Sequence, residues 1–330
     1  NRMDNHKLVT LLYGDDYRTI PQIEELYPPR VLPEGAKVTR FAPSPTGFVH
    51  FGSLLPTRVS ERLAHQSGGV FYLRVEDTDS KRRVEGAEED LIRTYSYFQI
   101  QFDEGPESGA YGPYHQSART DVYRAYAVKL LLEGRSYPCF ATAEQLDEIR
   151  AKQESAGADP GYYGEWAVWR DADYASVEAQ IKAGAPFVIR FRSEGDPSRK
   201  FKFTDLVKGA LELPENHMDH VLLKSDGVPT YHFAHAVDDT LMGTTHVVRG
   251  EEWLPSLPFH LQLFRALGFK PPKYLHIAQL LTRDADGSKR KLSKRDGSAS
   301  VSMYREKGYA PACITEYVMT LLNSNYEEWR

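Results

Sequence analysis

Cysteine is scarce in this sequence. The 330 residues include only two, Cys139 and Cys313, and neither has a partner at metal-ligand spacing. This pattern argues against a disulfide framework and a zinc cluster, and it is typical of a reducing compartment. We therefore expect no bound zinc and two buried, unreactive thiols.

Long apolar runs and an excess of positive charge are also missing. No stretch approaches the roughly 18 apolar residues that a membrane span needs, and the first 30 residues mix acidic with apolar side chains, unlike a signal or transit peptide. We expect a cytoplasmic protein without a membrane partner. Because the formal net charge is -5, a polyanion would have to meet a local basic patch, and SKRKLSKRD at 288–296 is one.

The sequence does contain an alternation of strand and helix patterns. A strand at 37–42, a helix at 52–66, a strand at 70–76 and a helix at 85–98 follow one another. This order predicts an α/β fold with a parallel, doubly wound sheet. With 41% hydrophobic residues, the chain is long enough to bury two or three linked cores.

The alternation is interrupted between residues 117 and 215. Helical stretches mix there with separate strands at 186–192 and 206–214, which predicts an inserted α+β domain. The alternation then resumes with a strand at 218–225, a helix at 231–243, a strand at 245–250, an amphipathic stretch at 251–268 and a strand at 274–278. We expect one sheet, interrupted by an insertion.

Five divisions of the chain follow from these patterns. They are an N-terminal extension and proline-rich linker at 1–36, the first half of the Rossmann-type domain at 37–116, the insert at 117–215, the second half of that domain at 216–278, and a basic loop with helices at 279–330. The first of them begins with a helix-like pattern. No internal repeat or low-complexity tract is present.

The segment RFAPSPTGFVHFGS joins the first strand to the first helix. Pro43 and Pro45 stiffen the end of the strand, and Gly47 lets the backbone reverse. The turn brings His50 and Gly52 to the helix start, where free amides and the helix dipole favour phosphate. Gly52 also leaves room for a nucleobase or ribose. The alternative, a stiffened turn with a capping histidine, explains this segment alone equally well.

The second basic motif, KLSKRDG, follows the last predicted strand. Lys291 and Lys294 flank Ser293, and the two lysines are suited to neutralise a triphosphate. A solvated surface loop is the commoner explanation for a single basic run. The combination of H-x-G-x at the first helix with K-x-S-K after the last strand is rarer by chance, and it resembles the class I aminoacyl-tRNA synthetases.

The resemblance is closer to one family within that class. RFAPSPTG, LRVEDTD, YHFAHAVDD, VVRGEEW and KLSKRDG stand in the order found in bacterial-type glutamyl-tRNA synthetases, from about Lys37 to the end. The turn and strand end typical of glutaminyl enzymes, P-P-E-P-N-G and F-D-D-T-N, are absent. The resemblance implies a class I Rossmann-type fold, an insert that binds the tRNA acceptor end, a KMSKS-type loop, and the start of a helical stem-contact region within 279–330.

The resemblance also implies an activity. L-glutamate would react with ATP, assisted by Mg²⁺, to give glutamyl-adenylate and pyrophosphate, and the glutamyl group would pass to the terminal adenosine of tRNA(Glu) in protein synthesis. Arg40 matches the family's arginine that pairs with the side-chain carboxylate of bound glutamate. Tyr231 matches the tyrosine that assists this arginine. Ser44 and Glu76 match positions at the α-amino group, and Arg249 matches the position at the α-carboxylate. Salt bridges within the sheet edge are the alternative for these residues.

The implied site residues form two sets. For glutamate they are Arg40, Ser44, Glu76, Tyr231, His235 and Arg249, and for ATP they are His50, Gly52, Glu252, Lys291, Ser293 and Lys294. His50, Lys291 and Lys294 would stabilise charge on the reacting phosphates. The sequence departs from the family at His235, where other members carry asparagine, and at Phe51, where isoleucine is commoner. The cysteines that bind zinc in some members are reduced here to YPCFA.

The helical anticodon-binding region of the family is missing. We therefore expect a shortened form of an enzyme of the usual length, acting as a monomer on tRNA(Glu), L-glutamate and ATP. One alternative is a glutamyl-queuosine tRNA synthetase-like paralogue, which is also short but usually has a degraded second motif. Another is a non-catalytic tRNA-binding module, because fold alone does not imply function. The intact KLSKRDG motif and His50 argue against both.

Overall fold

The computed structural model describes residues 3–47, 49–292 and 300–323. Its helices are α1 Asn5–Tyr13, α2 Ile20–Glu24, α3 Phe51–Gln66, α4 Ala87–Tyr97, α5 Thr120–Leu132, α6 Ala143–Ala156, α7 Tyr174–Lys182, α8 Tyr231–Leu241, α9 Leu257–Leu267, α10 Val301–Glu306 and α11 Pro311–Leu322, with short 3₁₀ helices η1 Gln116–Ala118, η2 Gly164–Trp166 and η3 Glu251–Ser256. Its strands are β1 Val38–Phe41, β2 Val70–Leu73, β3 Ser136–Cys139, β4 Val188–Phe191, β5 Lys200–Asp205, β6 Gly209–Pro214, β7 Val221–Leu223, β8 His246–Gly250, β9 Lys273–Ile277, β10 Leu281–Arg283 and β11 Lys289–Lys291.

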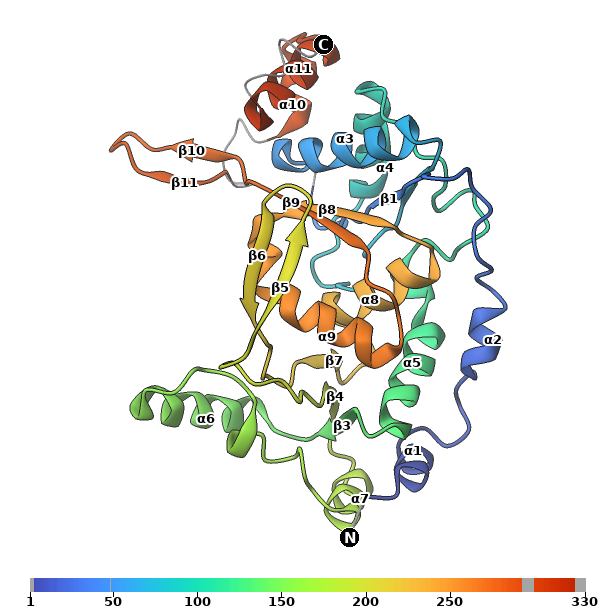
Figure 1. Ribbon diagram of the computed structural model, residues 1–330, viewed down its shortest axis with the longest axis vertical. Coiled ribbons are helices and arrows are strands. Elements are labelled where there is room, and N and C mark those ends of the chain that lie inside the picture. The colour runs from blue at the N-terminus through green and yellow to red at the C-terminus, as the bar shows by residue number, and fades with distance from the viewer. Residues whose placement is uncertain (1–2, 48, 293–299, 324–330) are drawn as a thin grey trace.

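Two pairs of parallel strands form the central layer. β1 pairs with β2 and β8 with β9, and the amide of Thr245 donates to the carbonyl of Val38 at 2.9 Å where the pairs meet. Figure 1 shows α3 on one side of this layer and α8 and α9 on the other. Phe71 of β2 packs with α3, whereas its neighbour Tyr72 belongs to the opposite side. The predicted α/β fold is thereby confirmed.

The insert forms a separate antiparallel sheet with strand order β3-β4-β7. The prediction that 218–225 returns to the parallel layer is wrong, because β7 pairs with β4. Buried Asp219, just before β7, accepts hydrogen bonds from Tyr137 at 2.6 Å and Arg170 at 2.7 Å, both in the insert. Three apolar residues alone do not determine which sheet a strand joins. The hydrogen bonds of Asp219 to the insert place β7 beside β4. The chain positions proposed for the five divisions stay predictions.

The hairpin β5–β6 projects from the insert onto the central layer (Figure 1). The strand predicted at 206–214 begins later, at Gly209, because residues 206–208 form the turn. Asp205 accepts the amides of Val207 and Lys208 there, each at 2.9 Å, and Gly209 has a φ of +76°. The amide of Leu206 donates to the carbonyl of Tyr274 in β9 at 2.9 Å, so the hairpin tip is hydrogen-bonded to the central layer.

The N-terminal segment belongs to the largest hydrophobic core. Leu8 and Val9 of α1 and Ile23 of α2 are buried in the cluster that contains α5, α8 and α9. Beyond the helices, the Arg30 guanidinium pairs with Glu104 at 2.6 and 3.0 Å. The predicted helical pattern is confirmed, and the segment is fastened to the rest of the molecule along its length.

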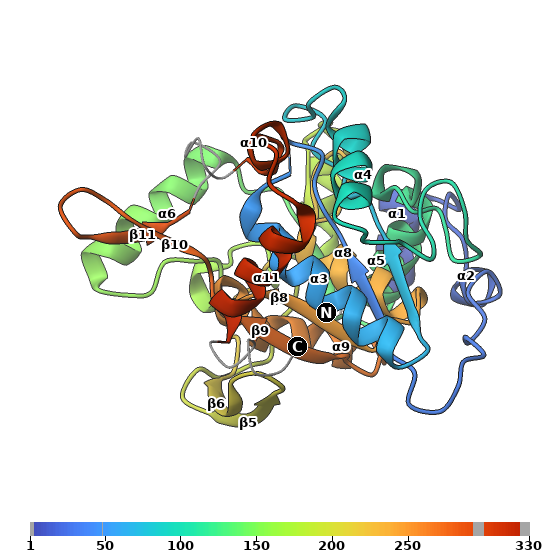
Figure 2. The same cartoon turned by 90° about the horizontal axis from the view of Figure 1, so that it is seen from above.

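The last described helices lie over α3 (Figures 1 and 2). Ile314 and Val318 of α11 are buried against the α3 cluster, while Cys313 is exposed. The expectation of two buried thiols is therefore right for Cys139 and wrong for Cys313. Across the described ranges no three His, Cys, Asp or Glu side chains are grouped to hold a metal ion, and the absence of zinc stays a prediction. No helix in these ranges is both long and apolar enough to cross a membrane.

Candidate active site

One cavity of about 280 Å³ brings together most of the residues predicted to bind an amino acid. The predicted residues in its lining are Arg40, Ser44, Glu76, Tyr231 and Arg249. They come from the carboxyl ends of β1, β2 and β8 and from the start of α8. Ligands bind at this edge of parallel sheets because the strand ends and their loops converge there.

Arg40 is held by a carboxylate that the sequence analysis did not single out. Its Nε and Nη2 donate to Asp239 at 2.9 and 3.2 Å, and Arg74 Nη1 donates to the same carboxylate at 3.0 Å. Burial alone would raise the pKa of Asp239, but the two guanidinium groups hold it well below its usual range. Of the alternative salt bridges, in which Glu76 or Asp77 pairs with Arg40 or Arg74, the described structure contains the pair between Arg74 and Glu76 at 3.8 Å. Because Asp239 is shared by two guanidinium groups, Arg40 is anchored by this carboxylate while part of its positive charge stays uncompensated at the cavity wall.

The neighbouring Asp238 extends this charged network. It accepts from Arg119 at 2.8 Å, from Tyr123 at 2.6 Å and from Gln116 at 3.0 Å. Both aspartates are fully buried on α8. The sequence contained one signal for this network. Two consecutive aspartates, in the segment VDD, stand in an otherwise apolar helix pattern, and buried carboxylates require cationic partners.

Glu76 contributes a carboxyl group to the cavity. Its Oε1 lies 3.8 Å from Arg74 Nη2 and has no hydrogen-bond partner in the described structure. Burial raises the pKa of Glu76 to about 7, against the lowering effect of Arg74 and Arg40. The raised pKa favours the protonated form of Glu76, and a cation in the cavity would favour its ionised form.

Arg249 has a different environment from Arg40. It is 5% exposed, and no carboxylate of residues 3–47, 49–292 or 300–323 lies within ion-pair distance of it. Nε donates to His276 at 3.0 Å, and Nη1 donates to His260 at 3.0 Å and to the Tyr231 hydroxyl at 3.2 Å. Nη2 has no partner. A buried cation surrounded by neutral groups favours binding of an anion beside it.

His235 does not line the cavity. It is fully buried, its ring stacks on Tyr231, and its two nitrogens contact Asp239 and the Tyr274 hydroxyl. Burial lowers the pKa of His235 to about 3, so the ring stays neutral. The prediction that His235 contacts the amino acid is therefore corrected to an indirect role, in which it supports Tyr231 and Asp239.

A second cavity of about 240 Å³ contains the described residues predicted to bind ATP, and it shares Pro56 with the first. His50, Gly52, Glu252 and Lys291 line it. The amide of Gly52 donates to His50 Nδ1 at 2.9 Å, so His50 also caps α3. A Cβ atom at Gly52 would lie 2.8 Å from that nitrogen. Ser293 and Lys294 lie outside the described residues.

Acidic and basic side chains also meet in the ATP cavity. Lys291 Nζ lies 3.4 Å from Glu252 Oε1. Burial would raise the pKa of Glu252, but hydrogen bonding to Gln279 and the charge of Lys291 lower it. Lys291 and Glu252 therefore form an ion pair in the lining of this cavity. A phosphate group that entered the cavity would compete with Glu252 for Lys291.

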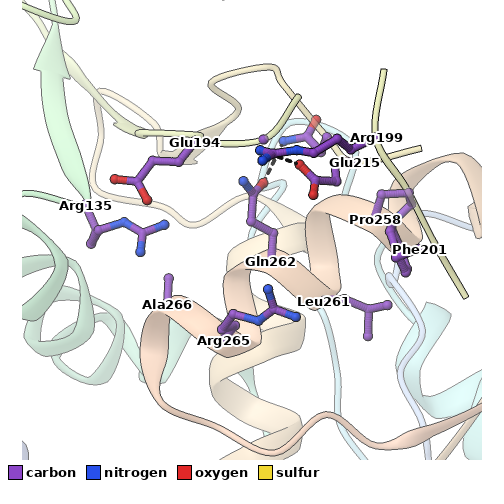
Figure 3. A pocket seen from close by; sticks show the side chains of 12 residues that line it. Arg135, Glu194, Arg199, Phe201, Glu215, Pro258, Leu261, Gln262, Arg265 and Ala266 are labelled. Atoms are coloured by element: carbon purple, nitrogen blue, oxygen red, sulfur yellow. Dashed lines mark hydrogen bonds and ion pairs between the residues drawn. The ribbon is translucent and has the colours of Figure 1, made fainter. Parts of the chain in front are cut away.

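A third cavity, of about 290 Å³, lies between α9 and the insert (Figure 3). Arg135, Arg199 and Arg265 line it together with Glu194 and Glu215. Arg199 pairs with Glu215 at 3.2 Å. None of the predicted site residues within the described ranges contributes to this lining.

Comparison with known proteins identifies the family of this chain. The family model for the catalytic domain of class I tRNA synthetases (E and Q) matches residues 37–328. Glutamate–tRNA ligases of Clostridium perfringens (strain 13 / Type A) and Acetivibrio thermocellus are 51% and 50% identical over 99% of this chain, which covers 61% of each. A solved glutamate tRNA ligase from Elizabethkingia meningosepticum, in complex with its amino acid, is 37% identical with a TM-score of 0.77, over 86% of this chain and 60% of that one. The chain thus spans about three fifths of the length of these relatives.

Proposed function

The chain belongs to the class I tRNA synthetases of the E and Q type, and from this membership we propose that it activates L-glutamate with ATP. The products would be glutamyl-adenylate and pyrophosphate, and the glutamyl group would then pass to the terminal adenosine of tRNA(Glu). The observation that carries the proposal is the charge pattern of the first cavity. Arg40, Arg249 and Glu76 line it together, two cations and one acid.

This pattern complements glutamate, which carries two carboxylates and one ammonium group. Arg40 would bind the side-chain carboxylate, Arg249 the α-carboxylate, and Glu76 with Ser44 the α-amino group. Glutamine would lose a charge-assisted hydrogen bond at Arg40, because its amide is neutral. Two relatives that are about half identical to this chain are named as glutamate–tRNA ligases, which supports this choice of amino acid.

Activation requires the α-carboxylate to attack the α-phosphorus of ATP in line, and pyrophosphate leaves. The two cavities share Pro56, so the amino acid and the nucleotide would meet at the first turns of α3. The protein would act by alignment and charge stabilisation rather than by forming a covalent intermediate. We assign His50 and Lys291 to the phosphates, together with Lys294 of the undescribed loop.

Mg²⁺ would neutralise phosphate charge during this reaction. Within the described residues no acidic cluster is built to hold the ion on its own. Mg²⁺ is commonly bound mainly through substrate phosphates and water, and we therefore assign it to ATP rather than to protein ligands. A cytoplasmic location and a monomeric state stay predictions.

Glutamate-dependent exchange of pyrophosphate into ATP tests the proposal, measured with and without tRNA(Glu). We expect exchange with glutamate and little with glutamine, and Arg40→Ala should abolish glutamate binding. Calorimetry that shows unchanged glutamate affinity in Arg40→Ala would contradict the assignment of that residue. Absence of exchange under all conditions would favour the non-catalytic module.

Transfer is tested separately with tRNA(Glu) that lacks its terminal adenosine. An enzyme that charges the terminal ribose will not glutamylate this tRNA. Unfractionated tRNA without the terminal adenosine is tested beside it, because a paralogue that modifies queuosine will still glutamylate the tRNA that contains this base. Intact tRNA(Glu) serves as the positive control. Equal glutamylation of both tRNAs would overturn the proposed acceptor.

A further inference from the structure

Arg249 is connected to the insert through one histidine. His276 of β9 accepts from Arg249 Nε at 3.0 Å through its Nε2, and its Nδ1 contacts Asp205 Oδ2 at 2.5 Å. Asp205 is the last residue of β5 and begins the hairpin turn. All three side chains are more than nine-tenths buried. The connection therefore runs from the hairpin of the insert to the wall of the amino-acid cavity.

The positions of the protons along this connection follow from Arg249. A guanidinium can only donate, so His276 must accept at Nε2 and carry its proton at Nδ1. That proton is donated to Asp205. Burial lowers the pKa of His276, which keeps the ring neutral and its Nε2 able to accept. The carboxylate of Asp205 thus selects the tautomer that Arg249 requires.

A second chain of histidines holds the other side of the guanidinium. His260 accepts from Arg249 Nη1 at Nδ1, and its Nε2 contacts His232 Nδ1 at 2.7 Å. The same reasoning places the His260 proton on Nε2. No carboxylate in the described part of the chain ends this second series, so the connection through His276 is the one that reaches a fixed negative charge.

We infer that Asp205 is a positioning residue for the amino-acid cavity, because through His276 it fixes the guanidinium of Arg249 against the cavity wall. This inference rests on the proposed function for its consequence, since Arg249 is the residue we assign to the α-carboxylate of glutamate. It makes the hairpin of the insert part of the amino-acid site. A displacement of the hairpin would release Arg249 even though no hairpin residue lines the cavity.

Asp205→Asn tests the connection with little change of volume. Oδ1 accepts two backbone amides, so the oxygen of asparagine will occupy that position and its amide nitrogen will face His276. The nitrogen can only donate, which forces His276 to accept at Nδ1 and to carry its proton at Nε2. That proton would then oppose Arg249 Nε–H. The opposite orientation of asparagine would oppose the amides of Val207 and Lys208.

Hydrogen exchange of the Arg249 Nε–H group, followed by NMR without any ligand, gives a readout that does not depend on activity. Arg249→Lys assigns the signal by its loss. We expect exchange to accelerate by at least about tenfold in Asp205→Asn, the factor that corresponds to one hydrogen bond to a charged group. Unchanged exchange would overturn the inference. His276→Phe removes the acceptor of Arg249 Nε and sets the largest acceleration. Asp205→Ser, which keeps a hydroxyl oxygen at the turn but not the carboxylate, decides the matter if Asp205→Asn does not fold.

Lys208→Gln is the matched control. It removes the ion pair between the hairpin and Glu251, which is 2.6 Å long, and leaves Asp205 in place. We expect normal exchange of Arg249 in this variant, and equal acceleration would show that hairpin docking in general, not Asp205, is responsible. In activation assays Asp205→Asn should raise the KM for glutamate by about tenfold or more and leave the KM for ATP unchanged. If the wild-type chain shows no activation, the proposed function fails while the exchange measurement still decides this inference.

Discussion

Arg40 and Arg249 line the same cavity but have opposite surroundings. Arg40 shares the buried carboxylate of Asp239 with Arg74, whereas Arg249 is surrounded by histidine and tyrosine side chains without a carboxylate partner in the described structure. Arg40 is thus anchored by a carboxylate of the fold before any ligand arrives. Arg249 is anchored by neutral groups, and an anion beside it would supply its counter-charge. The comparison separates an arginine that belongs to a buried ion-pair network from one that does not.

The largest effect is expected from removing the carboxylate that Arg40 and Arg74 share. Asp239→Asn leaves Arg40 and Arg74 buried without their shared counter-charge, and we expect the free energy of unfolding to fall by about 3–5 kcal/mol. Urea denaturation followed by circular dichroism measures this change. A midpoint equal to that of the wild type would show that the network is not needed for stability.

Removing the guanidinium of Arg249 should lower activity and leave stability unchanged. Arg249→Met deletes a buried cation that has no counter-charge, so we expect unfolding to be unchanged or slightly harder. Glutamate activation should lose roughly 10²- to 10³-fold in kcat/KM, as expected when one partner of a buried ion pair is truncated. Arg249→Lys keeps the charge but not the planar guanidinium, and its kcat/KM should lie between that of the wild type and that of Arg249→Met. A loss of stability as large as that of Asp239→Asn would remove the distinction between the two arginines.

Glu76 sharpens the comparison through pH. Its pKa of about 7 lies above the ordinary value of 4.5, so ionisation opposes folding and stability falls as pH rises between these values. Binding of the substrate ammonium needs the ionised form, and glutamate affinity should therefore fall by about tenfold per pH unit below 7. Calorimetry between pH 6 and 8 measures this slope. Glu76→Gln should bind glutamate weakly, with an affinity that does not change with pH. A wild-type affinity that is independent of pH would contradict the assignment of Glu76.

The smallest effect is expected at the surface. Asp171 pairs with Arg192 at 2.9 Å, but its side chain is 85% exposed. Solvent screens such pairs, so Asp171→Asn should change the free energy of unfolding by less than about 1 kcal/mol. The same urea titration compares it with Asp239→Asn. Similar losses in both variants would mean that burial does not distinguish the two ion pairs.

Residues at the ends of predicted strands could be identified from the sequence. Arg40, Glu76 and Arg249 each lie in the carboxyl-terminal half of a predicted strand, and parallel strands bring their carboxyl ends to one edge. Their convergence in one cavity agrees with that reasoning. The resemblance supplied the expected roles, which the strand pattern alone does not contain.

The supporting residues could not be identified in this way. Asp205 reaches His276 across 71 positions of sequence, and Arg40 reaches Asp239 across 199. These contacts depend on how the insert docks on β9 and how α8 packs below β1, and neither is encoded in a local pattern. His235 was assigned to the amino-acid site by the resemblance, and the strand pattern does not show on which side of the helix it lies. Its neighbour Tyr231 lines the wall, whereas the next turn of the helix lies behind it.

The N-terminal helices have a consequence for how the protein can be shortened. The match to the family model begins at residue 37, but the largest core already includes Leu8, Val9 and Ile23. A version trimmed to the matched region would expose the apolar face of α5 that these residues cover. Such surfaces promote aggregation. The region matched by the family model is therefore smaller than the region that shares the packed core, and recombinant production should keep residues 5–36.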